Sequence, residues 1–170
     1  VCFSCPAGEA DVDADPATAC DNCPPGTYST EATIECTPCL AGTYDGDNDA
    51  STPCVSCTQP GTYTIGGVSQ CIDCILGSAD EDLDASTSCT PCATGTFASV
   101  GATTCTPCTP GRSDLDSNPG TPCGLCVQGQ YNSLEGRTGA CDDCPSGLYG
   151  PVFESIAVGA CDACAMGQYA

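Results

Sequence analysis

Paired cysteines constrain this chain more than any other feature. All 20 cysteines among its 170 residues fall into ten C-x-x-C pairs, and successive pairs begin between 16 and 20 residues apart. Spacing this regular indicates an array of small repeats, each held by cross-links because no repeat is long enough to enclose a large core. The pairs are Cys2/Cys5, Cys20/Cys23, Cys36/Cys39, Cys54/Cys57, Cys71/Cys74, Cys89/Cys92, Cys105/Cys108, Cys123/Cys126, Cys141/Cys144 and Cys161/Cys164.

A glycine and an aromatic residue follow the pairs at fixed offsets. Glycine lies three residues after the second cysteine in nine of the ten repeats, which predicts a turn with positive φ. An aromatic residue usually follows two positions later, and all six tyrosines of the chain occupy this place. We interpret the aromatic as a packing element against a neighbouring disulfide; the alternative is a row of rings that stack on sugars. These residues are Tyr28, Tyr44, Tyr63, Phe97, Tyr131, Tyr149 and Tyr169.

Spaced acidic runs occur in alternate loops as far as Cys123, after which the alternation fades, and each run is followed by threonine two residues before the next cysteine. The repeating unit therefore contains two C-x-x-C loops. We predict two-loop units at 2–35, 36–70, 71–104 and 105–140, the last of them diverging, and a partial repeat at 141–170. The runs are Asp11, Asp13 and Asp15; Asp45, Asp47 and Asp49; Asp80, Asp82 and Asp84; and Asp114, Asp116 and Asn118.

Apolar residues are too sparse for an ordinary core. Aromatic residues make up 5% of the chain, tryptophan is absent, and glycine or proline recurs about every ten residues without helical periodicity between them. Short runs such as Gly-Thr-Tyr-Ser-Thr are typical of small hairpins. We therefore predict small disulfide-rich repeats: an extended rod of loop-rich modules with short β-hairpins and little or no helix.

Disulfide bonding explains the cysteines best, because every cysteine has a mate. In one connectivity the second cysteine of each pair bonds the first cysteine of the next pair, and Cys2 and Cys164 bond residues beyond this sequence. In the other, adjacent pairs bond first to first and second to second, and the sequence does not decide between the two. The first gives Cys5–Cys20, Cys23–Cys36, Cys39–Cys54, Cys57–Cys71, Cys74–Cys89, Cys92–Cys105, Cys108–Cys123, Cys126–Cys141 and Cys144–Cys161.

Two other uses of a C-x-x-C motif fit the sequence less well. Zinc sites would take two pairs each and would add thiolate charge to a chain whose net charge is already −20. A redox-active motif belongs at a helix N-terminus in a βαβ fold, and the chain has no such context.

The acidic runs suggest a hard cation. Alternating aspartates can converge on Ca²⁺, which takes six to eight oxygen ligands. The runs lack the glycine and glutamate of an EF-hand loop, so any calcium sites would be of another type, with the run residues named above as ligands. The alternative is that the aspartates are solvated turn residues. No other cofactor is predicted, and O-linked glycans are compatible with the abundant serine and threonine.

The run Cys20-Asp-Asn-Cys-Pro-Pro-Gly-Thr-Tyr-Ser resembles the ephrin-receptor-like cysteine-rich repeat and is similar to modules of tumour-necrosis-factor receptors. Asp-rich variants of this repeat look like those in large surface proteins of algae and other protists, including the flagellar hairs called mastigonemes. The resemblance covers nearly the whole chain. It implies an extracellular stalk, fibre or receptor ectodomain without catalysis.

Charge and composition exclude several classes of function. With 22 acidic residues, two arginines, no lysine and no histidine, the chain has no basic patch for nucleic acid or anionic membranes and no base for a nucleophile. No apolar segment is long enough to enter a membrane. The sequence starts and stops inside a repeat, so we expect a window from a longer secreted protein.

These observations predict an extracellular structural protein and not an enzyme. The repeats would form part of a filament, stalk or surface fibre, rigidified by calcium, at the cell surface or the flagellar surface. Its expected partners are further copies of itself or other matrix and filament proteins. The alternative is the ligand-binding ectodomain of a receptor or adhesin.

Overall fold

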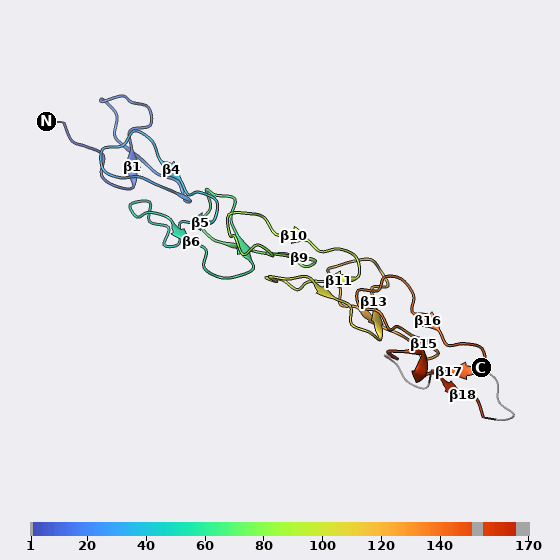
Figure 1. The fold of residues 1–170 in the computed structure, drawn as a ribbon. Coiled ribbons are helices and arrows are strands. Elements are labelled where there is room, and N and C mark those ends of the chain that lie inside the picture. Colours follow the sequence, from blue (N-terminus) through green and yellow to red (C-terminus); the bar gives the residue numbers. More distant parts are fainter. Residues whose placement is uncertain (1, 151–154, 166–170) are drawn as a thin grey trace. The chain divides into compact units, whose positions relative to one another are not determined.

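A computed structural model describes residues 2–150 and 155–165 of the chain. Within these residues the backbone forms nine two-stranded antiparallel sheets and one short 3-10 helix, η1 (Val158–Ala160). Each sheet is a hairpin of two neighbouring strands, from β1–β2 to β17–β18 (Figure 1). The predicted fold class, small disulfide-rich repeats with short hairpins and little helix, is confirmed.

Every strand spans two residues. The first strands of the hairpins are β1 (Glu9–Ala10), β3 (Thr27–Tyr28), β5 (Thr43–Tyr44), β7 (Thr62–Tyr63), β9 (Ser78–Ala79), β11 (Thr96–Phe97), β13 (Arg112–Ser113), β15 (Gln130–Tyr131) and β17 (Leu148–Tyr149). Their partners are β2 (Asp21–Asn22), β4 (Thr37–Pro38), β6 (Val55–Ser56), β8 (Ile72–Asp73), β10 (Thr90–Pro91), β12 (Thr106–Pro107), β14 (Gly124–Leu125), β16 (Asp142–Asp143) and β18 (Asp162–Ala163).

The second strand of each hairpin consists of the two residues between the cysteines of a pair. In the β3–β4 hairpin, Tyr28 lies opposite Thr37 and Thr27 lies opposite Pro38. The backbone N–H of Cys39 donates to the carbonyl of Gly26 at 2.9 Å. Because bonded and non-bonded pairs alternate in an antiparallel ladder, Pro38 falls in a non-bonded pair. A proline at the second middle position therefore costs the hairpin no ladder hydrogen bond.

The fixed offset of glycine, found after nine of the ten pairs, has two physical causes. Gly26 has φ of 82°, and the displaced Gly61 has a similar φ of 76°, so both occupy the left-handed region that favours glycine. Space is also restricted at several of these turns. A Cβ atom on Gly77 would lie 2.9 Å from the backbone nitrogen of Gly120, two loops further along the chain.

Nine disulfides each close one loop. Each joins the second cysteine of a pair to the first cysteine of the next pair, from Cys5–Cys20 to Cys144–Cys161. The Cα atoms are 5.5 to 6.0 Å apart, within the normal range for a disulfide. This is the first of the two connectivities considered from the sequence, and the crossed one does not occur among the described cysteines.

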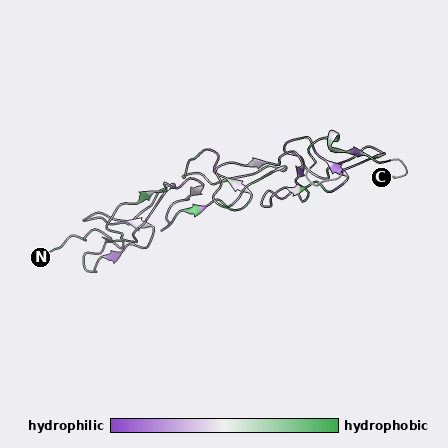
Figure 2. Cartoon of the chain, turned by 90° about the horizontal axis from the view of Figure 1, so that it is seen from below, coloured by the Kyte–Doolittle hydropathy of each residue, from purple (hydrophilic) through white to green (hydrophobic). Residues whose placement is uncertain are grey.

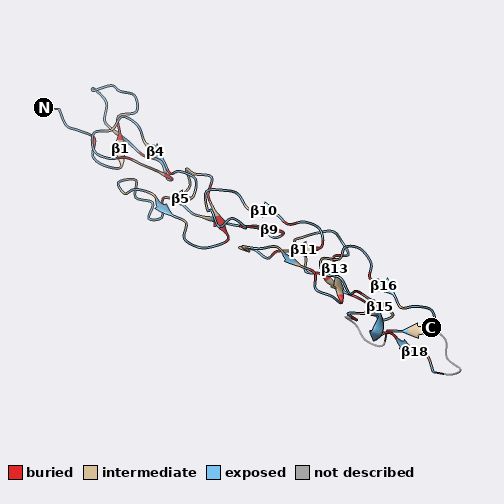
Figure 3. Ribbon diagram, viewed as in Figure 1, coloured by how far each residue is buried: buried red, intermediate tan, exposed pale blue. Residues whose placement is uncertain are grey.

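Cysteines and small residues make up most of the buried residues. The buried stretches are short and are distributed along the described chain (Figure 3). Where the aromatic is missing from its usual position, the small residues Ala10, Ala79 and Ser113 are fully buried there. The aromatic rings are less enclosed, and Tyr149 is 44% exposed. Contact between each ring and a disulfide stays a prediction, and Tyr169 lies outside the described residues.

The chain divides into two compact units. One contains the residues up to Cys74 together with Asp82–Cys89, and the other contains Ile75–Glu81 together with the residues from Thr90 onward. The division falls inside the loop closed by Cys74 and Cys89. The sequence-based boundaries at two-loop intervals stay a prediction. Strands coloured as hydrophilic and as hydrophobic both occur along the chain (Figure 2).

Candidate functional site

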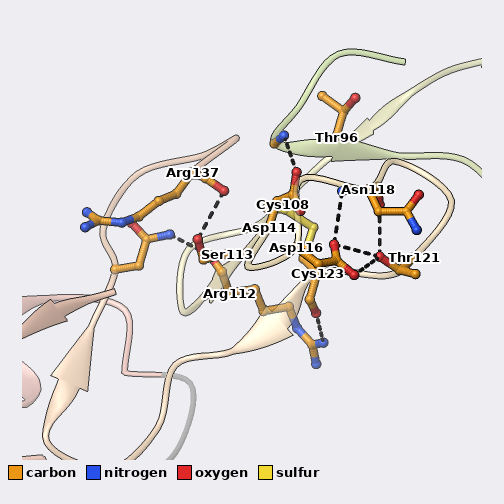
Figure 4. The surroundings of a disulfide bond; sticks show 12 residues. Thr96, Cys108, Arg112, Ser113, Asp114, Asp116, Asn118, Thr121, Cys123 and Arg137 are labelled. Atoms are coloured by element: carbon orange, nitrogen blue, oxygen red, sulfur yellow. Dashed lines mark hydrogen bonds between the residues drawn. A yellow bond between two sulfur atoms is a disulfide. The ribbon is translucent and has the colours of Figure 1, made fainter. Parts of the chain in front are cut away.

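The acidic loops share one hydrogen-bonded turn. In the second run the Asp47 carboxylate accepts the backbone N–H of Asp49 at 3.0 Å. The hydroxyl oxygen of Thr52 lies 3.1 Å from both Asp47 carboxylate oxygens and 3.0 Å from the Asp49 carbonyl. The same contacts recur with Asp13, Asp15 and Thr18; with Asp82, Asp84 and Thr87; and with Asp116, Asn118 and Thr121, the last of which is drawn in Figure 4.

The third residue of each run closes a second turn. The Asp49 carboxylate accepts the hydroxyl of Ser51 at 2.7 Å and its backbone N–H at 3.0 Å. These hydrogen bonds hold the pKa of Asp49 below its usual value, because they favour the charged form. Asn118 occupies the same place in the fourth run and accepts the N–H of Gly120 at 3.0 Å. A neutral amide oxygen therefore also closes this turn.

A left-handed residue separates the second and third residues of each run. Its φ lies between 51° and 57°, although none of the four residues is glycine. Asn48 suits this conformation, whereas the branched side chain of Leu83 does not. Leu83 is nevertheless held there, and its side chain is 68% exposed. The four positions are Ala14, Asn48, Leu83 and Ser117.

The first aspartate of a run has a different role from the other two. Asp45 and Asp114 are 6% and 5% exposed, and each carboxylate accepts a glycine N–H from the preceding loop. Gly26 donates to Asp45 at 3.3 Å and Gly95 donates to Asp114 at 2.9 Å. In Figure 4 the Asp114 contact reaches the segment next to Thr96. The first carboxylate thus joins consecutive loops and is directed away from solvent.

The aspartates that the sequence predicts as calcium ligands therefore form hydrogen bonds with different parts of the chain. Asp45 faces the preceding loop, whereas Asp47 and Asp49 form hydrogen bonds within their own turn. The part of the chain that the structure describes holds no group of three or more acidic, cysteine or histidine side chains placed to bind a metal. Calcium binding stays a prediction, and the hydrogen-bonded turn accounts for the spacing of the aspartates without a metal.

The first acidic run differs from the others in its surroundings. Asp11 is only partly buried, in contrast to Asp45 and Asp114. Desolvation raises the pKa of Asp11, and a hydrogen bond and the charge of Asp13 raise it further. The pKa of Asp13 is lowered, chiefly by the backbone hydrogen bond from Asp15. The two carboxyl groups of this run therefore interact with each other.

A residue that the sequence analysis missed bridges three successive loops. It directly follows the aromatic in alternate loops. Its carbonyl accepts a hydrogen bond from the N–H of the turn glycine in the loop before it, as from Gly8 to Ser29 at 3.2 Å. Its N–H donates to the loop after it, as in Ser29 N to Ala50 O at 3.0 Å. The corresponding residues are Thr64, Ala98 and Asn132.

The bridging residues also use their side chains. The Ser29 hydroxyl donates to the Glu9 carbonyl at 2.9 Å, and the Asn132 amide donates to the Arg112 carbonyl at 2.7 Å. Ser29, Thr64 and Asn132 are at most 2% exposed. A small polar residue after the aromatic in alternate loops is the sequence signal, and it is weak because Ala98 occupies the same position.

The two arginines are engaged by the repeats themselves. Arg137 donates to both carboxylate oxygens of Asp142 at 2.7 Å and to the Ala140 carbonyl. This ion pair raises the pKa of Arg137 and lowers the pKa of Asp142. Arg112 donates to the carbonyl of Cys123 at 3.3 Å, across its own hairpin (Figure 4). Both contacts support a structural role for these side chains.

Comparison with protein-family models and with curated proteins found no match. The fold and the cysteine pattern therefore define the class: an all-β repeat protein of disulfide-stapled hairpins, of the kind suited to extracellular structural proteins and ectodomains. Among the described residues, no helix has the length and hydropathy needed to span a bilayer.

Proposed function

We propose that this chain is a segment of an extracellular structural protein, in which disulfide-stapled loops build a filament, stalk or surface fibre. The observation that carries the proposal is that each disulfide closes a single loop, while backbone hydrogen bonds join that loop to its neighbours in the chain. An interface that repeats from loop to loop can be extended by adding loops. That property suits a rod better than it suits a compact binding domain.

Covalent cross-links replace the missing core in this proposal. The bridged cysteines are 13 to 17 residues apart. A loop of this size is stabilised by about 3 kcal/mol in the chain-entropy model. Disulfides persist in oxidising compartments, which supports a location outside the cell or on its surface, including a flagellar surface. The net charge of −20 favours solubility and an extended chain. Calcium and O-linked glycans remain part of this proposal.

A receptor or adhesin ectodomain is the second candidate. Several aliphatic side chains are strongly exposed, among them Ile65 (75%), Leu40 (74%) and Ile75 (70%). Exposed aliphatic residues can contact a protein ligand, although scattered single residues are common on protein surfaces. Partners under either function would be extracellular proteins: further copies of the chain and filament components in the first, a separate ligand in the second.

The oxidation state of the native protein tests the proposal. Protein from its natural source is alkylated without reduction, and its intact mass is measured. No added group is expected on the cysteines of the nine disulfides. Alkylation of most of the 20 cysteines would overturn the extracellular function. Antibody labelling of intact cells, followed by detergent fractionation, then separates an insoluble fibre from a detergent-soluble receptor.

A further inference from the structure

Three hairpins carry an exposed threonine at the same place. The tetrapeptide Cys-Thr-Pro-Cys occurs in each of them, and its threonine begins the second strand. None of the three hydroxyl groups forms a hydrogen bond to another described residue. The first-strand Thr96 is different, because its hydroxyl donates to the Ala93 carbonyl at 2.6 Å. The second-strand hydroxyls are therefore open to chemical modification. They belong to Thr37 in β4, Thr90 in β10 and Thr106 in β12.

A small hollow lies beside the last of these threonines. Thr106 lies opposite Phe97 in the β11–β12 ladder, so the two side chains are on the same face of the hairpin. The hollow has a volume of about 190 Å³, and both of these residues line it together with Pro107, Arg112, Pro122 and their neighbours. Pockets for drug-sized ligands begin at about 300 Å³. This hollow therefore suits a single ring.

The residues that line the hollow match the chemistry of a sugar. Phe97 and the two prolines offer apolar surface to the C–H face of a pyranose ring. The Arg112 guanidinium donates to the carbonyl of Cys123 at 3.3 Å, and such a group has five N–H donors, which suit sugar hydroxyls. The net charge of −20 disfavours an acidic sugar at this place. A neutral hexose combines the properties that the hollow requires.

We propose that Thr106 is an O-glycosylation site and that its first sugar, a neutral hexose, occupies the hollow beside Phe97. The hydroxyl precedes a proline, and threonine with proline is the composition of O-glycosylated stalks. A chain with nine disulfides also belongs to the oxidising compartments of secretion, where glycosyltransferases act. The inference rests on the proposed extracellular function and deepens it by naming a residue that carries a glycan.

The attachment is a group transfer from a nucleoside-diphosphate sugar, catalysed by a glycosyltransferase. The Thr106 hydroxyl oxygen forms a bond to the anomeric carbon of the sugar. The bond between that carbon and the phosphate oxygen breaks, and the nucleoside diphosphate leaves with the bonding electron pair. A base of the transferase takes the hydroxyl proton. No group is oxidised or reduced.

Two other threonines show why Thr106 is the preferred site. Thr109 also lines the hollow and precedes a proline, but it follows the end of β12, so the hairpin ladder does not hold it opposite Phe97. Thr90 has the same hairpin position as Thr106, but it lies opposite the fully buried Ala79 instead of an aromatic residue. Only Thr106 of these three combines an exposed hydroxyl, a facing ring and the hollow.

Site mapping on protein from its natural source tests the attachment. After reduction and alkylation, cleavage by trypsin and chymotrypsin gives the peptide 98–112, whose threonines are Thr103, Thr104, Thr106 and Thr109. Electron-transfer fragmentation is expected to place a hexose on Thr106. An unmodified peptide, a hexose on another residue only, or a phosphate on Thr106 would overturn the proposal. If the same protein is oxidised, such a result leaves the proposed extracellular function intact, so the two failures are distinguishable.

A matched pair of ring variants tests the position of the sugar. Phe97→Leu removes the ring opposite Thr106, whereas Tyr44→Leu removes the ring at the same hairpin position opposite Val55. Both variants are produced in cells of the natural source. Enzymatic release of the hexose from the folded, oxidised protein should become at least about threefold faster in Phe97→Leu, because contact with the ring is lost. Release should stay within about twofold of wild type in Tyr44→Leu, and equal rates in the two variants would overturn the placement in the hollow.

Proton NMR of the glycosylated wild-type protein gives a second measurement, which does not depend on the folding of a variant. Nuclear Overhauser contacts between the sugar protons and the Phe97 ring are expected in the oxidised protein. They should disappear when the disulfides are reduced and the chain unfolds. A hexose on Thr106 that shows no contact with Phe97 in the oxidised protein would overturn the proposed position of the sugar.

Discussion

At the scale of the residue, Leu83 stands in a conformation that its side chain disfavours. Left-handed backbone costs a non-glycine residue roughly 1–2 kcal/mol, and the exposed Leu83 side chain recovers little of this by packing. We expect Leu83→Asn to stabilise the oxidised protein by about 1 kcal/mol, measured by denaturant unfolding. Leu115→Asn is the control, because Leu115 is also exposed but has no positive φ. A Leu83 variant that is less stable than wild type would show that the leucine makes contacts worth more than the strain.

Gly26 tests whether the turn glycines serve backbone conformation alone. A Cβ atom there would overlap the carbonyl group of Gly67, in addition to adopting a φ of 82°. Gly26→Ala should therefore destabilise its unit by more than about 2 kcal/mol. Gly101 also has positive φ but has open space around it, so Gly101→Ala should cost only about 1 kcal/mol. Thermal unfolding of the two variants should separate the cost of the positive φ from the cost of steric overlap. Equal losses of stability in both variants would contradict the contact with Gly67.

At the scale of the element, the acidic turns depend on charged carboxylates. Hydrogen bonds lower the folded-state pKa of Asp49 and Asp84, chiefly those from Ser51 and Ser86. A depressed pKa stabilises the fold above the unfolded pKa of about 3.9, and this stabilisation is lost as pH falls through the folded pKa. We expect the contribution of these turns to stability to be constant from neutral pH to about pH 5 and to fall progressively below about pH 4.

The amide resonances of Ser51 and Gly120 measure this effect within one molecule. Ser51 donates to the Asp49 carboxylate, whereas Gly120 donates to the uncharged side chain of Asn118. On acid titration by NMR, the Ser51 resonance should move with the carboxylate, and the Gly120 resonance should move less. Equal shifts would mean that protonation acts through the whole loop instead of through the direct hydrogen bond.

The sequence predicted the hairpins well because covalent spacing and turn chemistry are local. The cysteine interval fixes each loop, and the glycine offset fixes the turn beside it. The three aspartates of a run looked equivalent in sequence, yet Asp45 bonds a different loop from the one that Asp47 and Asp49 close. Bridging residues such as Ser29 were missed for the same reason: their role depends on which loops lie beside them, and the only local signal, a small polar residue after the aromatic, is broken by Ala98. The division within the loop of Cys74 and Cys89 was also not anticipated.

At the scale of the whole molecule, calcium remains the main open prediction from sequence. If the runs bind calcium as predicted, added calcium should raise the unfolding temperature and a chelator should reverse the rise. Asp47→Asn should remove part of the response in its own loop. Extracellular calcium sites of this kind bind in the range of about 10⁻⁴–10⁻³ M. Calorimetric titration at these concentrations with no heat, and unchanged melting with chelator, would leave the hydrogen-bonded turn as the only role of the aspartates.

The closure of every loop by its own disulfide also determines how the chain would carry a load. A pulling force would pass through each disulfide and not around the loop that it closes. The load-bearing length of a repeat therefore consists only of the C-x-x-C backbone and the Cα–Cα distance of 5.5 to 6.0 Å across the disulfide. That path is about 17 Å per repeat, against about 60 Å for the same residues once the bridge is cut. Single-molecule stretching should find a short, nearly inextensible tether, and reduction should lengthen it about threefold. The maximum extension of such a chain would therefore depend on whether its disulfides are oxidised or reduced.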